Sequence, residues 1–132
     1  MSVETVSHET LLDPWYVTGL IDGVGSFTFS RSGKQFAVYF AVKFGGPSNL
    51  LADLQWFFQG GTIYQSTKTS YFRVQRREHL SLVVDHFDQF PLRAKADVYA
   101  IWREMVVAKQ EFRKPNRDRL EQLATELSAR TH

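Results

Sequence analysis

The chain of 132 residues has a formal net charge of +2 and is 43% hydrophobic, which suits one folded domain with a core and excludes a disordered tail. It has no cysteine, so disulfides and cysteine-ligated zinc are excluded. The opening MSVETVSHET carries acids and no apolar core, and no apolar run reaches the length of a membrane span, so we expect an intracellular protein with neither a leader peptide nor a membrane partner.

The first predicted element is a helix from Pro14 to about Val24. Asp13 is a suitable N-cap, and proline is favoured at the first helical position because no N–H is needed there. Gly25 then releases the chain into alternating apolar and polar residues, which predict two strands over 26–44 that turn near residues 32–34. The chain therefore begins with a helix followed by a hairpin.

The same order of elements is predicted for the next part of the chain. Apolar residues return to helical spacing over 50–58, and Gly60 and Gly61 are expected to end this second helix. Alternation resumes over 62–77 and predicts a second hairpin with its turn near residues 68–70.

Helical patterns occupy the rest of the chain. Helices are expected over 78–90, 93–110 and 117–130, with breaks at Pro91 and Pro115, and the last helix is amphipathic. Four antiparallel strands with helices on one side form an α+β domain.

Polar side chains of both hairpins fall on one face of the predicted sheet, opposite the apolar side chains that face the helices. This polar face contains no acid, and its members are Thr28, Ser30, Ser32, Gln35, Tyr39, Lys43, Tyr64, Ser66, Lys68, Tyr71, Arg73 and Gln75. Residues 24–77 hold seven lysines and arginines against one acid, Asp53. A merely solvated face also alternates, but it gains from mixed charge, whereas this composition suits phosphate oxygens and base edges. The polar face is therefore predicted to bind DNA.

The chain resembles the LAGLIDADG homing endonucleases over residues 13–110. YVTGLIDGVGSF falls on the helix that carries the family motif, YFAVKF resembles the second strand, and LADLQWFFQGGTIY resembles the second helix and the turn after it. SYFRVQ is similar to the fourth strand, and VVDHFDQFPLRAKADVYAIW to the third helix and the lysine-containing segment that follows. Because these segments occur in the same order, the resemblance is more specific than any single motif.

The resemblance implies a helix-hairpin-helix-hairpin-helix fold whose saddle-shaped sheet lies along the major groove of DNA. Residues 1–12 would form a tail, 13–112 the DNA-binding domain, and 113–132 a C-terminal helix packed on that domain. With one motif in the sequence, the chain is expected to form a homodimer and to bind a pseudo-palindromic site. The expected dimer interface consists of Trp15, Gly19, Leu20 and Gly23. The two glycines lie four residues apart and would let two helices approach closely, unless they only relieve crowding within one subunit.

Val24 occupies the position of the family's catalytic acid. The resemblance implies that two such acids, one per subunit, hold a divalent metal at the scissile phosphates. Valine offers no oxygen to a metal, and Asp22 lies about 200° around the helix, where the resemblance implies a structural role. Phe44 stands where the family has a polar residue that orders water, whereas Lys95 matches the lysine near the scissile phosphate.

We therefore expect a homodimeric, sequence-specific binder of double-stranded DNA that has lost metal-dependent cleavage, either a regulator or a decayed mobile-element protein. Catalytic residues, metal ligands and cofactors are not expected, with Mg²⁺ required only if cleavage persists. Two alternatives stay open: an active endonuclease that recruits metal through another oxygen, and an RNA-binding intron maturase. The expected location is the cytoplasm or nucleoid, or an organelle if the gene lies in an intron.

The histidines show no ligand spacing, and His86 is expected at a helix surface.

Overall fold

Two helix-hairpin units follow one another along the chain, and further helices complete the fold. The computed structural model describes residues 12–33, 35–46, 48–110 and 114–131. Its elements are α2 (Pro14–Val24), β1 (Gly25–Ser32), β2 (Gln35–Gly45), α3 (Leu50–Phe58), β3 (Thr62–Gln65), β4 (Thr69–Val74), α4 (Arg77–Gln89), α5 (Ala96–Gln110) and α6 (Lys114–Thr131). The strands form one antiparallel sheet in the order β1-β2-β4-β3. The expected α+β class and order of elements are confirmed.

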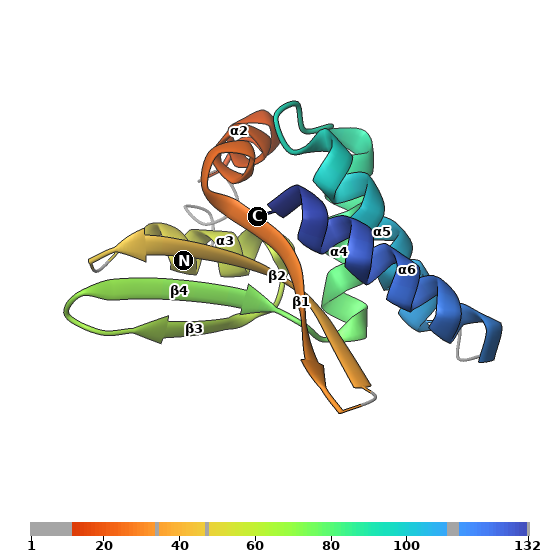
Figure 1. Ribbon diagram of the computed structural model, residues 1–132. Helices are drawn as coiled ribbons and strands as arrows, with labels where there is room; N and C mark the ends of the chain where they lie inside the picture. Colours follow the sequence, from red (N-terminus) through yellow and green to blue (C-terminus); the bar gives the residue numbers. More distant parts are fainter. Residues whose placement is uncertain (1–11, 34, 47, 111–113, 132) are drawn as a thin grey trace.

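The helix α2 has the predicted start and the predicted end. The Asp13 carboxylate accepts hydrogen bonds from the backbone N–H of Trp15 at 2.8 Å and of Tyr16 at 3.3 Å. At the other end, β1 begins at once with Gly25, where a Cβ atom would collide with Ile21. The helix and the first strand therefore join without a loop, which fixes the direction of β1 relative to α2 (Figure 1).

Two details of the second unit differ from the prediction. The left-handed residue after α3 is Gln59, with φ of 58°, while Gly61 is needed because a Cβ there would meet the ring of Phe72. The hairpin turns at residues 66–68 instead of 68–70. Ser66 sets this turn, since its hydroxyl accepts hydrogen bonds from the backbone N–H of Lys68 and Thr69 at 3.3 and 3.1 Å.

The later helices also begin at other residues than predicted. Helix α6 starts at Lys114, before the expected break, because proline is tolerated in the first turn of a helix, where its missing N–H is not needed. Helix α5 starts at Ala96, and residues 93–95 form a connection that the side chain of Asp22 holds.

The hydrophobic core lies between the apolar face of the sheet and the helices, of which α4, α5 and α6 gather on one side of the molecule in Figure 1. Phe27 of β1 is 2% exposed and lies against the rings of Phe40 at 5.4 Å and Trp102 at 5.1 Å between centroids. The indole N–H of Trp102 donates to the backbone oxygens of Thr28 at 3.1 Å and Tyr39 at 2.9 Å. Helix α5 is thereby tied to the back of the strand pair whose front carries polar side chains.

Helix α6 packs along α5 and reaches the first hairpin. Its buried side chains are Leu120, Leu123, Ala124 and Leu127. Glu121 on the same helix accepts two hydrogen bonds from the guanidinium of Arg31, near the end of β1, at 3.0 and 2.9 Å. Residues 1–11 of the predicted tail lie outside the described residues, and Leu12 packs against the core.

Candidate nucleic-acid interface

The polar face predicted from alternation exists as one continuous surface of the sheet. Cross-strand pairing places Thr28 opposite Tyr39, and Lys43 opposite Tyr71, which in turn lies opposite Tyr64. Partners in an antiparallel ladder point to the same side, so these residues share one face. Ser30, Ser32, Gln35 and Arg73 belong to it by the same register, and Ser66 and Lys68 lie in the β3–β4 turn beside it. Gln75 follows the end of β4.

Several polar residues of this face were missing from the sequence-based set. Ser26, Thr62 and Thr69 alternate with members of the set and therefore point to the same side. The same alternation that identified Thr28, Tyr64 and Tyr71 would have identified them. Ala41 also lies on this face, next to Arg73, and leaves a low area in its middle.

An arginine and three tyrosines form a cluster on strands β2, β4 and β3. The guanidinium carbon of Arg73 lies 3.6 Å from the ring centroid of Tyr39, a cation–π contact, and the rings of Tyr64 and Tyr71 are 6.0 Å apart. Burial raises the pKa of Tyr71 above its usual range; neighbouring Tyr39 raises it further, and Arg73 opposes the shift. Tyr71 is therefore a neutral hydroxyl at physiological pH, able to donate and accept hydrogen bonds.

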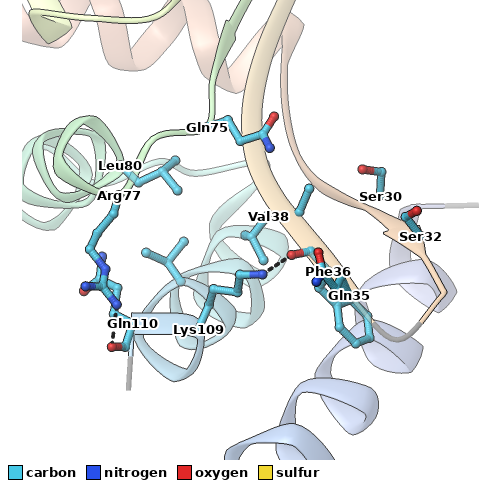
Figure 2. A pocket seen from close by; sticks show the side chains of 12 residues that line it. Ser30, Ser32, Gln35, Phe36, Val38, Gln75, Arg77, Leu80, Lys109 and Gln110 are labelled. Atoms are coloured by element: carbon cyan, nitrogen blue, oxygen red, sulfur yellow. Dashed lines mark hydrogen bonds between the residues drawn. The ribbon is translucent and has the colours of Figure 1, made fainter. Parts of the chain in front are cut away.

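The face ends in a pocket of about 540 Å³ between the tip of the first hairpin and helices α4 and α5 (Figure 2). Four of the predicted residues line it, namely Ser30, Ser32, Gln35 and Gln75. Its cations are held by the protein's own backbone, since Lys109 donates to the Phe36 carbonyl and Arg77 donates to the Gln110 carbonyl at 2.7 Å. Hydroxyl and amide groups are therefore what this end of the face offers to a ligand.

The helix α2 exposes an unusual amount of apolar surface. Trp15 is 57% exposed, Tyr16 51% and Val24 42%, while Leu20 is partly buried against the core. No described atom lies within 4 Å of a Cβ atom built on Gly19 or Gly23. Within the described part of the chain, the glycines thus relieve no crowding, so the simpler explanation for their presence finds no support there. Both lie on open helix surface that a second helix can approach.

The side chain of Asp22, near the end of α2, binds the connection before α5. Its carboxylate accepts hydrogen bonds from the backbone N–H of Arg93 at 3.2 Å, Ala94 at 3.0 Å and Lys95 at 2.9 Å. The ammonium of Lys95 in turn donates to the Asp22 carbonyl at 2.9 Å. Burial acts to raise the pKa of Asp22, but the three backbone hydrogen bonds outweigh it and hold the pKa below its usual range. The ammonium of Lys95 is thereby held at the C-terminal end of α2, the helix end that also carries Val24.

Replacing Asp22 by asparagine should loosen this connection. Asparagine cannot present two acceptor oxygens to three N–H groups, so the free energy of unfolding should fall by about 1–3 kcal/mol. Chemical denaturation at neutral pH measures the loss. Because the folded-state pKa is lowered, the carboxylate's contribution is present above the unfolded pKa and is lost as the pH falls through the folded pKa. An equal stability of the variant and the parent at pH 7 would contradict the assigned role.

His86 is buried, which contradicts the surface position expected from the sequence. It is 8% exposed and lies among aromatic rings, stacked on Phe90 with centroids 5.3 Å apart. Its Nε2 lies 3.0 Å from the hydroxyl of Thr18, which itself donates to the Phe90 carbonyl at 2.8 Å. Because the Thr18 hydroxyl already donates its proton to the Phe90 carbonyl, it acts as the acceptor toward His86, and His86 Nε2 is the protonated donor. Burial lowers the pKa of His86 to about 4.

The side chains at the end of α2 offer few oxygen ligands to a divalent metal. A hard cation requires several oxygen ligands, and Val24 has none. Both oxygens of Asp22 are engaged by backbone N–H groups. Phe44, at the end of β2, packs against the core. Within the described ranges no three His, Asp or Glu side chains are grouped closely enough to hold a metal.

Comparison with known proteins agrees with the fold and the order of these elements. The LAGLIDADG endonuclease family matches residues 17–106, which is most of the chain. The chain belongs to the LAGLIDADG endonuclease family. In the described part of the chain, no helix combines the length and apolarity needed to cross a bilayer.

Two relatives carry names that refer to introns. A protein of Podospora anserina, described as an uncharacterized 50.9 kDa protein in ND4 intron 1, is 28% identical over 116 residues, which cover 78% of this chain and 26% of the relative. The probable intron-encoded endonuclease Cox1-I1b of Schizosaccharomyces pombe is 34% identical over 88 residues, which cover 61% of this chain and 23% of the relative. The chain thus spans about a quarter of the length of these relatives.

Solved structures share the fold at low sequence identity. The homing endonuclease I-TnaI superposes with a TM-score of 0.79 at 23% identity, covering 88% of each chain. The LAGLIDADG meganuclease I-AabMI, solved bound to uncleaved DNA, gives a TM-score of 0.79 at 23% identity over 86% of this chain and 44% of its own. A further structure, I-SmaMI bound to its uncleaved DNA target with calcium, gives 0.77 at 24% identity over 88% of this chain and 45% of its own.

Proposed function

We propose that this protein binds a specific double-stranded DNA site through the polar face of its sheet and does not cleave it. The observation that carries the proposal is the absence of acids from a continuous face of cations, hydroxyls, amides and aromatic rings. Such a face attracts phosphates and offers hydrogen-bonding groups to base edges in the major groove. Membership of the family and the DNA-bound state of related structures support the same conclusion.

The second element of the proposal is a homodimer formed through α2. The helix exposes Trp15 and Tyr16 beside open surface at Gly19 and Gly23, and Leu20 lies at the edge of this surface. Aromatic side chains next to small residues suit a close contact between two helices. Two copies related by twofold symmetry would place two polar faces on a pseudo-palindromic site.

The loss of cleavage is proposed from the donor atoms at the end of α2. Val24 provides no oxygen, and a homodimer repeats the same deficit in both subunits. Lys95 remains able to bind a phosphate there, because its hydrogen bond to the Asp22 carbonyl uses one of the three N–H donors of its ammonium. Binding and cleavage would thereby be separated in this protein, as expected of a regulator or of a decayed mobile-element protein.

A binding and cleavage assay on one selected duplex tests the proposal. The protein should shift a duplex selected from a random pool and should leave it intact during incubation with Mg²⁺ or Mn²⁺. Double-strand cuts at nanomolar protein would identify an active endonuclease instead. Equal or tighter binding of structured RNA in competition with the duplex would favour an intron maturase, a role that agrees with the intron-related names of the relatives. An organellar location would follow if the gene lies in such an intron.

Val24→Glu should restore part of the missing activity. The substitution places one carboxylate in each subunit at the end of α2, where Val24 is 42% exposed and the longer side chain has room. A metal held there stabilises charge at the phosphate, so we expect cutting of the selected duplex with Mg²⁺ where the parent gives none. Val24→Gln is the matched control, with nearly the same shape and no charge. Cutting by both variants, or equally by the parent, would contradict the explanation.

A further inference from the structure

We propose that Arg73 binds a guanine in the major groove and that the ring of Tyr39 holds its guanidinium in position for that contact. The inference rests on the proposed function, because it names the base that one residue of the polar face recognises. Arg73 is thereby given a different role from the lysines of the same face, whose single charged groups suit phosphates.

The position of Arg73 favours a contact with a base rather than with a phosphate. Strand β4 is an inner strand of the sheet, and the partners of Arg73 on both sides are short: Ala41 on β2 and Thr62 on β3. Its long side chain therefore stands in a low area in the middle of the polar face. Base edges line the floor of the major groove and phosphates its rims, so the middle of the face is the place from which a base can be reached.

The contact with Tyr39 restricts the position of the guanidinium. The guanidinium carbon lies over the ring, 3.6 Å from its centroid, which is a close cation–π contact. The backbone of Tyr39 is held from behind, because its carbonyl accepts a hydrogen bond from the indole of Trp102 at 2.9 Å. A guanidinium already held in one orientation loses less freedom when DNA binds, which favours a directional contact.

The protein does not neutralise this arginine. Among the ion pairs of the described residues none includes Arg73, whereas Arg31, Arg103 and Arg119 each pair with an acid. Its Nε is buried without a hydrogen-bond partner, and the neighbouring Tyr71 is a neutral phenol. With no acid of the described residues paired to it, the guanidinium keeps its charge for an acceptor of the ligand.

Guanine is the base that fits a fixed guanidinium. Its O6 and N7 are two adjacent acceptors in the major groove, and arginine donates two parallel hydrogen bonds to them. Adenine presents one acceptor beside an amino group, and that amino group would oppose a second donor. The expected preference is one guanine for each copy of the chain on the DNA.

Selection of bound duplexes from a random pool provides the first test. The wild-type chain should enrich a site with an invariant guanine at one position per half-site, and Arg73→Gln should lose the preference at that position alone. Affinity for the wild-type site should fall roughly 5- to 100-fold. Lys68→Gln is the control: removal of this exposed cation from the β3–β4 turn should weaken all duplexes alike and reduce the salt dependence, without changing the selected bases.

Replacement of single guanines by 7-deazaguanine gives the second test, because this base lacks the N7 acceptor and still pairs normally. At one guanine per half-site the replacement should weaken wild-type binding and should have no further effect on Arg73→Gln. Such coupling locates the contact between one side chain and one base atom. Tyr39→Phe should keep the guanine preference because the ring remains, whereas Tyr39→Ala should reduce it while circular dichroism and the melting temperature confirm a folded protein.

Several outcomes would overturn the inference. A selected site that Arg73→Gln leaves unchanged, or a loss spread evenly over all sequences as for Lys68→Gln, would show that Arg73 does not recognise a base. If another base were enriched at the position that depends on Arg73, guanine would not be the base that Arg73 recognises. If the wild-type chain enriched no duplex at all, the proposed function would fail together with the inference, whereas failure of the Arg73 variants alone leaves DNA binding intact.

Discussion

Gly19→Gln should convert a dimer into a monomer and weaken binding of the selected duplex on the order of 100-fold or more. A glutamine side chain on the exposed face of α2 would block the close approach of two helices, and each copy would then bind only one half-site without the advantage of a linked second contact. The substitution should not harm the fold. A Cβ atom at this position meets no described atom within 4 Å, and glutamine is a better helix former than glycine.

Light scattering after size exclusion measures the oligomeric state, and titration of the selected duplex measures the affinity. Ala100→Gln is the matched control, because it places the same side chain on an exposed position of α5. The control should remain dimeric and bind like the parent. A parent chain that is monomeric at micromolar concentration and on DNA would refute the dimer. If the Gly19→Gln variant remained dimeric, the dimer interface would not include Gly19.

Acid should destabilise the protein in a pH range set by His86. The pKa of this residue is lowered by burial from 6.5 to about 4, so the unfolded chain takes up a proton that the folded chain refuses between these values. Stability is therefore complete above pH 6.5 and declines as the pH falls toward 4. The expected loss in the free energy of unfolding is roughly 3 kcal/mol.

Urea unfolding at a series of pH values from 7 to 4 measures this decline. His86→Phe should flatten it, since phenylalanine fits among the rings of Phe57, Phe87 and Phe90 and does not titrate. The exposed neighbour Asp85→Asn should retain the parent's slope in this range. Because Thr18 of α2 is the partner of His86, protonation should also release α2 from α4, and dimer formation should weaken in the same range. An unchanged slope in His86→Phe would assign the acid sensitivity to another group.

Alternation and capping residues were sufficient to predict the strands and most helix boundaries. The polar face followed because residues two apart on a strand share a side, and the start of α2 followed from Asp13 and Pro14. Boundaries were missed where a side chain distant in sequence or a local hydrogen bond decided them. Residues 93–95 leave the helix because Asp22, far away in the chain, binds their N–H groups. The second turn lies earlier than predicted because the Ser66 hydroxyl accepts hydrogen bonds from two backbone N–H groups within it.

The environment of individual side chains was the part that periodicity did not reveal. His86 reads as a polar position of an amphipathic helix, yet the ring is buried because α2 brings a hydroxyl to it from 68 residues away. The contact of Arg73 with Tyr39 depends likewise on the register in which β2 pairs with β4, which alternation within each strand does not specify. Contacts between elements can be identified only from the packed structure, whereas the side of each element that a residue occupies can be predicted from the sequence.

Helix α6 sets the limits of the unit that can be exchanged between proteins of this kind. The family match ends at residue 106, before α6 begins at Lys114, yet α6 buries three leucines against α5 and holds Arg31 near the tip of the first hairpin. A recombinant protein that took only the matched segment would expose the apolar back of α5 and release one end of its recognition surface. Grafting this domain onto a new partner therefore requires the chain through residue 131.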